Sequence, residues 1–224
     1  MTPEVTGPGP AGRVRHVFTD VDHGDLAVDG APGLLATRRR AVVDLPWTWL
    51  RQVHDAGVVT VTRPGEHAGA DADAAVTATP GAALAVHTAD CAPVLLDAGA
   101  AFGVVHAGWR GLASGVLEAA VDALEELGHR PVRAVLGPCI RPRCYEFGEA
   151  ELDAVVERCG PAARSRTADG APALDVAAGI RSICAGLSIP VHDAGTCTAC
   201  SPRHWSHRAR ADPARQALVA WMEP

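Results

Sequence analysis

The sequence contains no lysine: its 20 lysine-or-arginine positions are all arginine. A mechanism that needs a lysine Schiff base or a lysine general base is therefore excluded. The sequence also lacks any run of 18 apolar residues, so we expect no transmembrane helix. No basic segment followed by an apolar stretch opens the chain, so there is no pattern of a secretion signal and we expect a cytoplasmic protein.

Positive charge is also in short supply, and the formal net charge is −6. This balance argues against binding to nucleic acid or to anionic membranes, because both depend on clustered basic residues. We therefore expect small-molecule ligands, no nucleic-acid or membrane partner, and a monomer.

The 224 residues are 48% hydrophobic, which is sufficient for a packed core. Residues 1–12 are rich in proline and glycine and predict a flexible arm. No repeat or low-complexity linker interrupts the rest, so we expect one catalytic domain over residues 13–224. Apolar runs bounded by turn residues predict strands at residues 14–19, 58–62, 83–88, 93–96, 102–106, 133–136, 189–192 and 216–222.

Helical periodicity is clearest where Leu117, Val121 and Leu124 recur with acidic residues on the opposite face. It predicts a helix over residues 112–127, and similar patterns predict helices over 149–159 and 174–187. Strands and helices do not alternate strictly, which favours an α+β fold without a separate Rossmann unit. We expect a mixed, sandwich-like β-sheet core flanked by helices.

Metal-binding side chains follow or end three strand-like segments. His54 follows Arg51-Gln52-Val53, Cys91 closes a Thr-Ala-Asp-Cys segment, and His106 ends an apolar run. Two imidazoles and one thiolate suit zinc, and three protein ligands leave a fourth position open, as in catalytic sites. A single His or Cys is more often a core residue, and the three lie far apart in the sequence, so spacing alone supports the site only weakly.

The seven cysteines are an odd number, and disulfides are not expected in a reducing compartment. Cys197 and Cys200 have the C-x-x-C spacing of a zinc knuckle. With Cys139 and Cys144 they could form a structural four-cysteine zinc site. The two remaining cysteines, Cys159 and Cys184, fall on predicted helices and are expected in the core.

Several longer segments carry a resemblance to a known family. They are QVH (52–54), ALAVHTADCAPVLL (83–96), VVHAGWRGLASGVLEAAV (104–121), GPCIRPRCYEFG (137–148), CTACSPRHWSHRAR (197–210) and ARQALVAWM (214–222). The chain resembles the multicopper polyphenol oxidase, or laccase-domain, family, whose members are also described as purine nucleoside phosphorylases or peptidoglycan editing factors. The resemblance implies that His54, Cys91 and His106 hold a zinc ion.

The chain departs from the family pattern in two places. Members usually carry a glycine-rich loop and an Asn-Leu segment where this chain has only His23-Gly24-Asp25-Leu26. That loop helps to form the mouth of the pocket, so substrate preference is open. The usual tandem arginines appear as Arg208-Ala209-Arg210, and either arginine could bind the substrate or an anion.

The resemblance implies a zinc-dependent purine nucleoside enzyme that catalyses phosphorolysis of adenosine, inosine or methylthioadenosine and deamination of adenosine. Zinc-activated water suits deamination, whereas phosphorolysis needs an anion clamp. Arg110, between Gly108 and Gly111, is the first candidate for that clamp. Asp90, Tyr145 and Glu146 are candidate general acids or bases, with no step assigned to any of them.

Two other functions stay open at this point. An amide hydrolase that edits peptidoglycan precursors could use the same zinc or Cys91 as its nucleophile. A copper-dependent polyphenol oxidase would need about ten histidine ligands, many of them in His-x-His pairs. The chain has ten histidines in all and no such pair, so Cu²⁺ is the less favoured metal.

Overall fold

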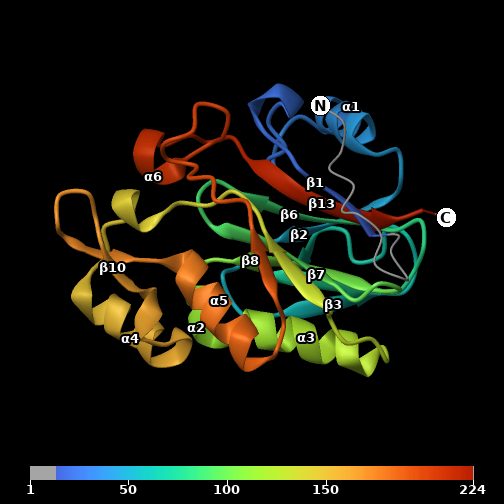
Figure 1. Cartoon of the computed structure of the whole chain (residues 1–224). Helices are drawn as coiled ribbons and strands as arrows, with labels where there is room; N and C mark the ends of the chain where they lie inside the picture. Colours follow the sequence, from blue (N-terminus) through green and yellow to red (C-terminus); the bar gives the residue numbers. More distant parts are fainter. Residues whose placement is uncertain (1–13, 224) are drawn as a thin grey trace.

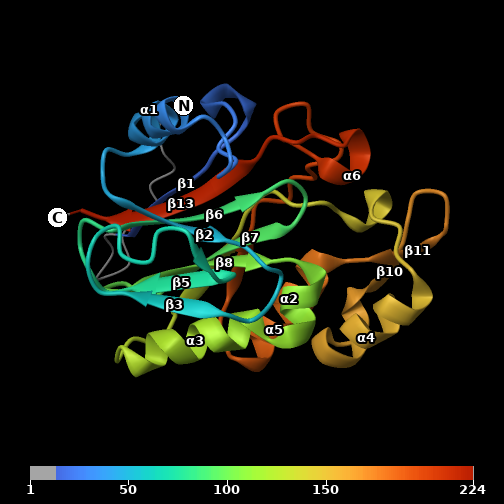
Figure 2. The same cartoon turned by 180° about the vertical axis from the view of Figure 1, so that it is seen from behind.

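Two β-sheets packed face to face form the centre of the fold, and helices cover both outer faces (Figures 1 and 2). The structure is a computed structural model that describes residues 14–223. The arm expected at residues 1–12 lies outside the described residues. The sandwich-like α+β architecture predicted from the sequence is confirmed.

The first sheet has five strands and contains both the earliest and the latest strand of the described chain. Its order is β1 (Val14–Phe18), β13 (Gln216–Met222), β6 (Ala83–Thr88), β2 (Trp47–Arg51) and β4 (Ala70–Asp71). Strand β13 runs antiparallel to both β1 and β6, while β2 runs parallel to β6. Helix α1 (Pro32–Val42) covers the outer face of this sheet.

The second sheet has six strands, of which the four central ones pair antiparallel with one another while each edge strand runs parallel to the strand beside it. Its order is β12 (Val191–Asp193), β9 (Arg133–Leu136), β7 (Ala92–Asp97), β8 (Phe102–Ala107), β5 (Ala74–Thr77) and β3 (Val58–Val61). Its outer face is covered by helices of the second half of the chain, namely α2 (Trp109–Ser114), α3 (Val116–Glu126), α4 (Glu149–Cys159) and α5 (Val176–Gly186).

Smaller elements complete the chain around one end of the sandwich. They are a two-stranded ribbon of β10 (Arg164–Arg166) and β11 (Pro172–Leu174), helix α6 (His207–Arg210), and 3-10 helices at Val21–His23, Pro142–Cys144 and Pro161–Ala163. None of the helices among residues 14–223 is both long enough and apolar enough to cross a membrane.

Burial on both faces explains why the central strands are continuous apolar runs rather than alternating ones. In β6, Leu84 and Val86 pack between the two sheets, whereas Ala83 and Ala85 pack in the cluster that contains α1. The helix side of this strand therefore carries the smaller side chains. Large residues such as Phe102 fill the layer between the sheets.

The expected helix over residues 112–127 is divided into α2 and α3. Gly115 lies between them with φ +88°, a left-handed conformation that glycine adopts without strain, and it ends α2. The helix expected from residue 174 begins at Val176, because the Asp175 side chain accepts from the N–H of Ala178 and caps it. Cys159 and Cys184 are buried, as expected.

Candidate metal centre

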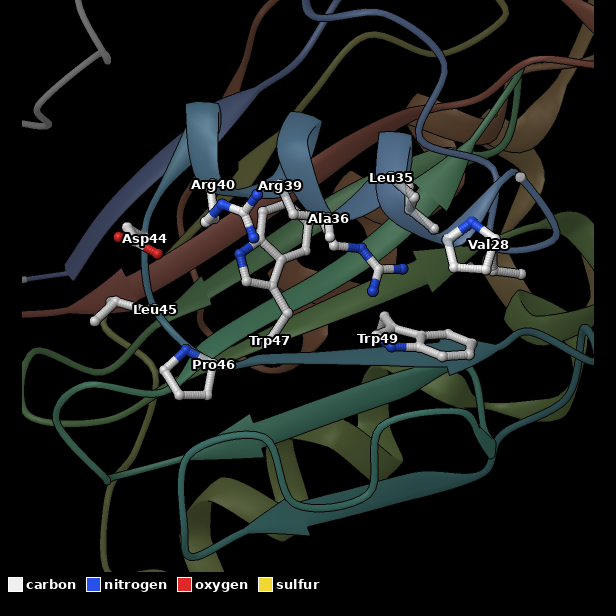
Figure 3. Close-up of a pocket in the computed structure, with 12 residues that line it drawn as sticks. Val28, Leu35, Ala36, Arg39, Arg40, Asp44, Leu45, Pro46, Trp47 and Trp49 are labelled. Carbon is white, nitrogen blue, oxygen red and sulfur yellow. The ribbon is translucent and has the colours of Figure 1, made fainter.

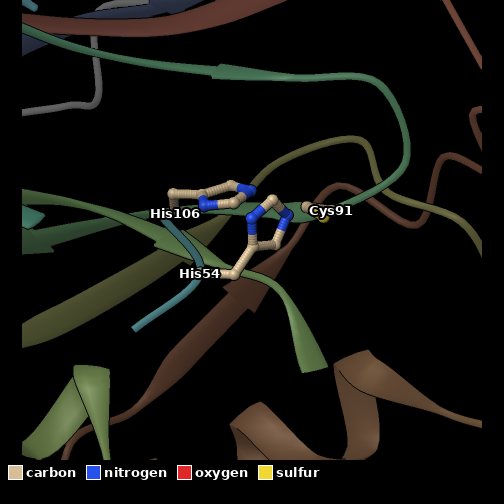
Figure 4. Close-up of side chains that lie close together, drawn as sticks. All are labelled: His54, Cys91 and His106. Atoms are coloured by element: carbon tan, nitrogen blue, oxygen red, sulfur yellow. The ribbon is translucent and has the colours of Figure 1, made fainter. Parts of the chain in front are cut away.

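Both sheets contribute to one cluster of metal-binding side chains. His54 follows β2 of the five-stranded sheet, Cys91 lies in the connection from β6 to β7, and His106 belongs to β8 of the six-stranded sheet. Their ligand atoms all lie within 4.8 Å of one another (Figure 4). The structure thus brings together the three residues that the sequence analysis predicted as metal ligands.

Gln52 fixes the chain where it leaves β2 towards His54. Backbone pairing between β2 and β6 ends at Trp49 and Ala85. Beyond it, the Gln52 amide donates to the carbonyl of His87 and accepts from its N–H, both at 2.7 Å. The Gln52 side chain therefore extends the hydrogen-bonded pairing of β2 with β6 beyond the last backbone pair. This explains why a glutamine precedes Val53 and His54.

Asp73 is a fully buried carboxylate that orients both histidines, and the sequence analysis missed it. It accepts hydrogen bonds from the N–H groups of Val53 (3.1 Å), His54 (3.0 Å) and Asp55 (2.9 Å). These bonds hold His54 at φ +63°, which is uncommon outside glycine. Asp73 also bonds Nδ1 of His106 at 2.7 Å, which leaves Nε2 of that ring for a metal.

Cys91 and His106 stabilise each other's charged forms. Burial works against a thiolate at Cys91, but the positive charge of His106 and hydrogen bonds from His106 and His54 lower its pKa to about 6. Burial likewise opposes charge on His106, but the Cys91 thiolate and Asp73 raise its pKa to about 9. At neutral pH a metal ion could therefore bind the Cys91 thiolate directly, and binding to His106 would displace one proton from its ring.

The thiolate of Cys91 gives a direct pH test. In metal-free protein, the ultraviolet thiolate absorbance that wild type shows and Cys91→Ser lacks should rise as the pH passes through about 6, well below the pKa of about 8.5 of a free cysteine. In His106→Ala the same difference should appear only above about 8, because burial is then opposed by His54 alone. A wild-type midpoint above about 8 would contradict the assigned charge pair.

Because Gly108 has no side chain, the side chains of His54, Cys91 and His106 can approach one another beside it. A Cβ at this position would lie 3.1 Å from Cδ2 of His54, 3.3 Å from Sγ of Cys91 and 3.7 Å from Cε1 of His106. The backbone of Gly108 is ordinary, with φ −74°, so space and not conformation requires glycine here.

Gly108→Ala should therefore weaken metal binding while the protein stays folded. We expect about a tenfold or greater loss of zinc affinity, comparable to disturbing the groups that orient metal ligands, measured by competition with a chelator. Gly33→Ala is the matched control, because a Cβ there meets no atom within 4 Å. Equal zinc affinity in both variants would show that the ligands do not need the space at Gly108.

A cavity of about 570 Å³ opens onto the three ligands. Its wall includes Gln52, His87, Thr88, His207 and Arg215, together with Val28 and its neighbours from the segment before α1. Both ring nitrogens of His87 and the hydroxyl of Thr88 are buried and have no hydrogen-bond partner among the described residues. Burial lowers the pKa of His87 to about 3, so its ring is neutral.

A second cavity, of about 560 Å³, lies between α1 and β2 (Figure 3). The guanidinium of Arg39 stands 5.6 Å from the ring of Trp47 and 5.0 Å from that of Trp49. Neither of the two metal-competent clusters found among residues 14–223 lines it. We therefore place the candidate site in the first cavity.

Tyr145 lies near Cys91, Arg110 and Arg208, and neither Tyr145 nor the two arginines line the 570 Å³ cavity. The guanidinium of Arg110 stacks on Trp109 at 4.4 Å and that of Arg208 on Tyr145 at 4.8 Å. Burial and the charge of Cys91 raise the pKa of Tyr145 to about 12, against the effect of both arginines. Tyr145 therefore keeps its proton at neutral pH and is a hydrogen-bond donor rather than a base.

The other candidate catalytic or anion-binding residues are Asp90, Glu146 and Arg210, and each takes part in hydrogen bonds within the fold. The Asp90 carboxylate accepts from Thr198 Oγ1 at 2.6 Å and from the N–H of Arg208 at 2.7 Å. Glu146 is exposed, and its carbonyl accepts from Arg208. Arg210 binds the Asp212 carboxylate and the carbonyls of residues 198, 199 and 204. Of the two arginines of the Arg-Ala-Arg segment, Arg208 is the one beside Tyr145, while catalytic roles for Asp90 and Glu146 stay predictions.

Comparison with known proteins identifies the family. The family model described as multi-copper polyphenol oxidoreductase laccase matches residues 13–223. The chain belongs to this family. The resemblance expected from the HTADC and HAGWRG segments is thus confirmed.

Relatives of this laccase-family chain include proteins named purine nucleoside phosphorylase. One from Streptomyces coelicolor is 43% identical over 197 residues, covering 84% of this chain and 80% of the relative. One from Mycobacterium tuberculosis is 39% identical over 216 residues, covering 92% and 86%. A crystal structure of a Neisseria meningitidis protein, 30% identical, superposes with a TM-score of 0.83 over 98% of both chains. A Bacillus licheniformis protein, 24% identical, shares the fold with a TM-score of 0.82 over 94% and 93% of the two chains.

The donor set of the laccase-family centre fits a metal ion. Two imidazoles and one thiolate are a set of intermediate softness that suits zinc, and three ligands leave one position open to solvent or substrate. The carboxylate behind His106 completes the arrangement that orients a histidine ligand in metal sites. No other histidine joins the cluster among residues 14–223, so the cluster offers ligands for a single metal ion.

Proposed function

We propose that this chain is a zinc-dependent purine nucleoside phosphorylase whose metal is held by His54, Cys91 and His106. The observation that carries the proposal is the convergence of these ligands on a cavity of about 570 Å³. That volume is in the range of small-molecule pockets, and relatives at about 40% identity are named for this activity. Zinc bound here would polarise a substrate oxygen or activate a water.

The cavity wall offers groups for a purine base. A neutral imidazole can donate from one nitrogen and accept at the other, and a hydroxyl can do both. His87 and Thr88 line the cavity and carry such atoms, buried and without protein partners among residues 14–223. The edge of a purine alternates donors and acceptors, so it would satisfy polar atoms that are otherwise costly to bury.

Phosphate would bind on the side of the centre that carries Arg110 and Arg208. Each guanidinium lies over an aromatic ring, and no ion pair with a carboxylate is found for either among the described residues. Arg208 already donates from one nitrogen to the carbonyl of Glu146, so its remaining N–H groups and those of Arg110 would be the ones to contact phosphate. The protonated hydroxyl of Tyr145 lies near both charges and could donate to the departing base or to phosphate.

The test is turnover by zinc-loaded protein of adenosine, inosine and methylthioadenosine at several phosphate concentrations. We expect the free base and a ribose 1-phosphate, at a rate that depends on phosphate. Inosine formed from adenosine without phosphate would add the deaminase activity that we also propose for this site. Cleavage of a UDP-linked muramic-acid precursor, with all nucleosides untouched, would replace the proposal by precursor editing. Phenol oxidation restricted to copper-loaded protein would replace it by the oxidase.

Arg110→Ala should impair the use of phosphate more than the use of nucleoside. Losing a charge-assisted contact of about 1.5–3 kcal/mol corresponds to a fall of about 10- to 150-fold in kcat/KM for phosphate. Arg40→Ala, an exposed arginine on α1, is the control and should change nothing. If arsenate, phosphate and water are all affected equally as acceptors, Arg110 has a structural role instead.

A further inference from the structure

A second group of metal-competent side chains lies outside the centre described above. The sulfurs of Cys144, Cys197 and Cys200 all lie within 4.8 Å of one another, and those of Cys144 and Cys200 are 3.3 Å apart. Cys144 ends the 3-10 helix Pro142–Cys144, while the other two belong to one turn after β12. The fold therefore joins residues 56 positions apart in the sequence. All three are free thiols at least partly open to solvent.

The spacing of these sulfurs matches a metal site better than a disulfide. With zinc–sulfur bonds of about 2.3 Å, a tetrahedral site places its sulfurs about 3.8 Å apart. A disulfide needs about 2.05 Å and excludes the third sulfur. The distances up to 4.8 Å and down to 3.3 Å bracket the tetrahedral value, so a metal could bind with small side-chain rotations.

The turn that carries Cys197 and Cys200 is arranged to hold a thiolate. Burial opposes charge on the sulfur of Cys197, but the backbone N–H groups of Arg141, Cys200 and Ala199 favour its charged form. Donors of this kind stabilise the charged form of a sulfur. A C-x-x-C turn whose own amides bind its first sulfur has the spacing of a zinc knuckle.

We propose that Cys144, Cys197 and Cys200 form a second zinc site, with its fourth position open to water. Cys139 does not take part, which corrects the four-cysteine site considered from the sequence. Its backbone forms a bridge with Cys197, but its side chain is fully buried in the apolar core. Zinc would displace the protons of the thiols that it binds.

The second zinc would clamp two segments that border the first centre. Cys144 precedes Tyr145 directly. Between Cys197 and Cys200, Thr198 bonds the Asp90 carboxylate, which stands next to Cys91. A metal here would therefore fix the edge of the fold that carries Tyr145 relative to the connection that carries Cys91. This is a structural role, and it does not depend on which reaction the first centre catalyses.

The test is the number of zinc ions retained by purified protein, measured by mass spectrometry under non-denaturing conditions. We expect two in wild type, one in Cys91→Ser, one in Cys200→Ser and none in the double variant. Cys144→Ser should behave like Cys200→Ser. Cys139→Ala is the matched control and should retain both ions, because its thiol is not a ligand.

Cobalt substitution separates the two sites by their chemistry. In Cys91→Ser, the remaining cobalt should show a thiolate-to-metal absorption about three times as intense as in Cys200→Ser, since three sulfurs replace one. A second zinc that survives in both Cys144→Ser and Cys200→Ser would overturn the proposal. So would a disulfide between Cys144 and Cys200 in protein purified under reducing conditions, or a single zinc in wild type that Cys91→Ser removes completely.

Discussion

Cys91→Ser is expected to empty the first metal centre and to lower kcat/KM for nucleoside phosphorolysis about 10³-fold or more, because a catalytic metal supplies several kcal/mol of transition-state stabilisation. Serine keeps roughly the size of the side chain but replaces the thiolate with a hydroxyl that stays protonated at neutral pH. His106→Ala should give the same loss by removing an imidazole and unpairing Asp73. Turnover and metal content should fall together in both variants.

A buried cysteine away from the centre provides the control for this loss. Cys184 lies on α5 in the core between the helices and the six-stranded sheet. Cys184→Ala should retain the metal of the first centre and most of the activity, with a modest loss of stability at most. If Cys91→Ser stayed as active as Cys184→Ala, chemistry at this centre would be ruled out.

Asp73→Ala is expected to have the largest effect on stability. It would leave the buried N–H groups of residues 53, 54 and 55 without an acceptor and remove the partner of His106. Breaking a buried charged network in this way costs about 3–5 kcal/mol, and losing the carboxylate behind a histidine ligand weakens metal binding about 10- to 100-fold. Urea unfolding and zinc titration measure the two effects.

The control lies two residues earlier. Asp71 pairs with Arg51 at 3.1 Å, but the two side chains are 62% and 68% exposed. Asp71→Ala should therefore change the free energy of unfolding by about 0–1 kcal/mol. Should both variants lose the same small amount, the bonds of Asp73 would not be holding the loop of His54.

The sequence predicted the parts of the fold that are continuous apolar runs. Residues 83–88, 102–106 and 133–136 are strands as expected, and the amphipathic pattern at Leu117, Val121 and Leu124 lies on α3. The three ligand residues also converge as expected, although the family resemblance supported that expectation more than their spacing did. Continuous burial produces a local signal that periodicity can detect.

Other parts of the site left no local signal. The sequence analysis did not anticipate β2 or β5, because β2 mixes tryptophan with Thr48 and Arg51 and β5 begins with two alanines, which are depleted in strands. It also missed α1, whose apolar residues are interrupted by three consecutive arginines. Asp73, which comes just before β5, therefore looked like one of several acidic residues in a loop. Its acceptor role depends on N–H groups about 20 residues away in the chain, which only tertiary structure brings together.

The position of β13 has a consequence for synthesis on the ribosome. Residue Val14 of β1 pairs with Met222 of β13, and β6 pairs with the other edge of β13. A ribosome adds roughly 5–20 residues per second, so on the order of ten to forty seconds pass between the synthesis of β1 and that of its partner strand β13. During that time two strand edges are open to other chains. A nascent chain arrested before residue 216 should therefore depend on chaperones to stay free of aggregation.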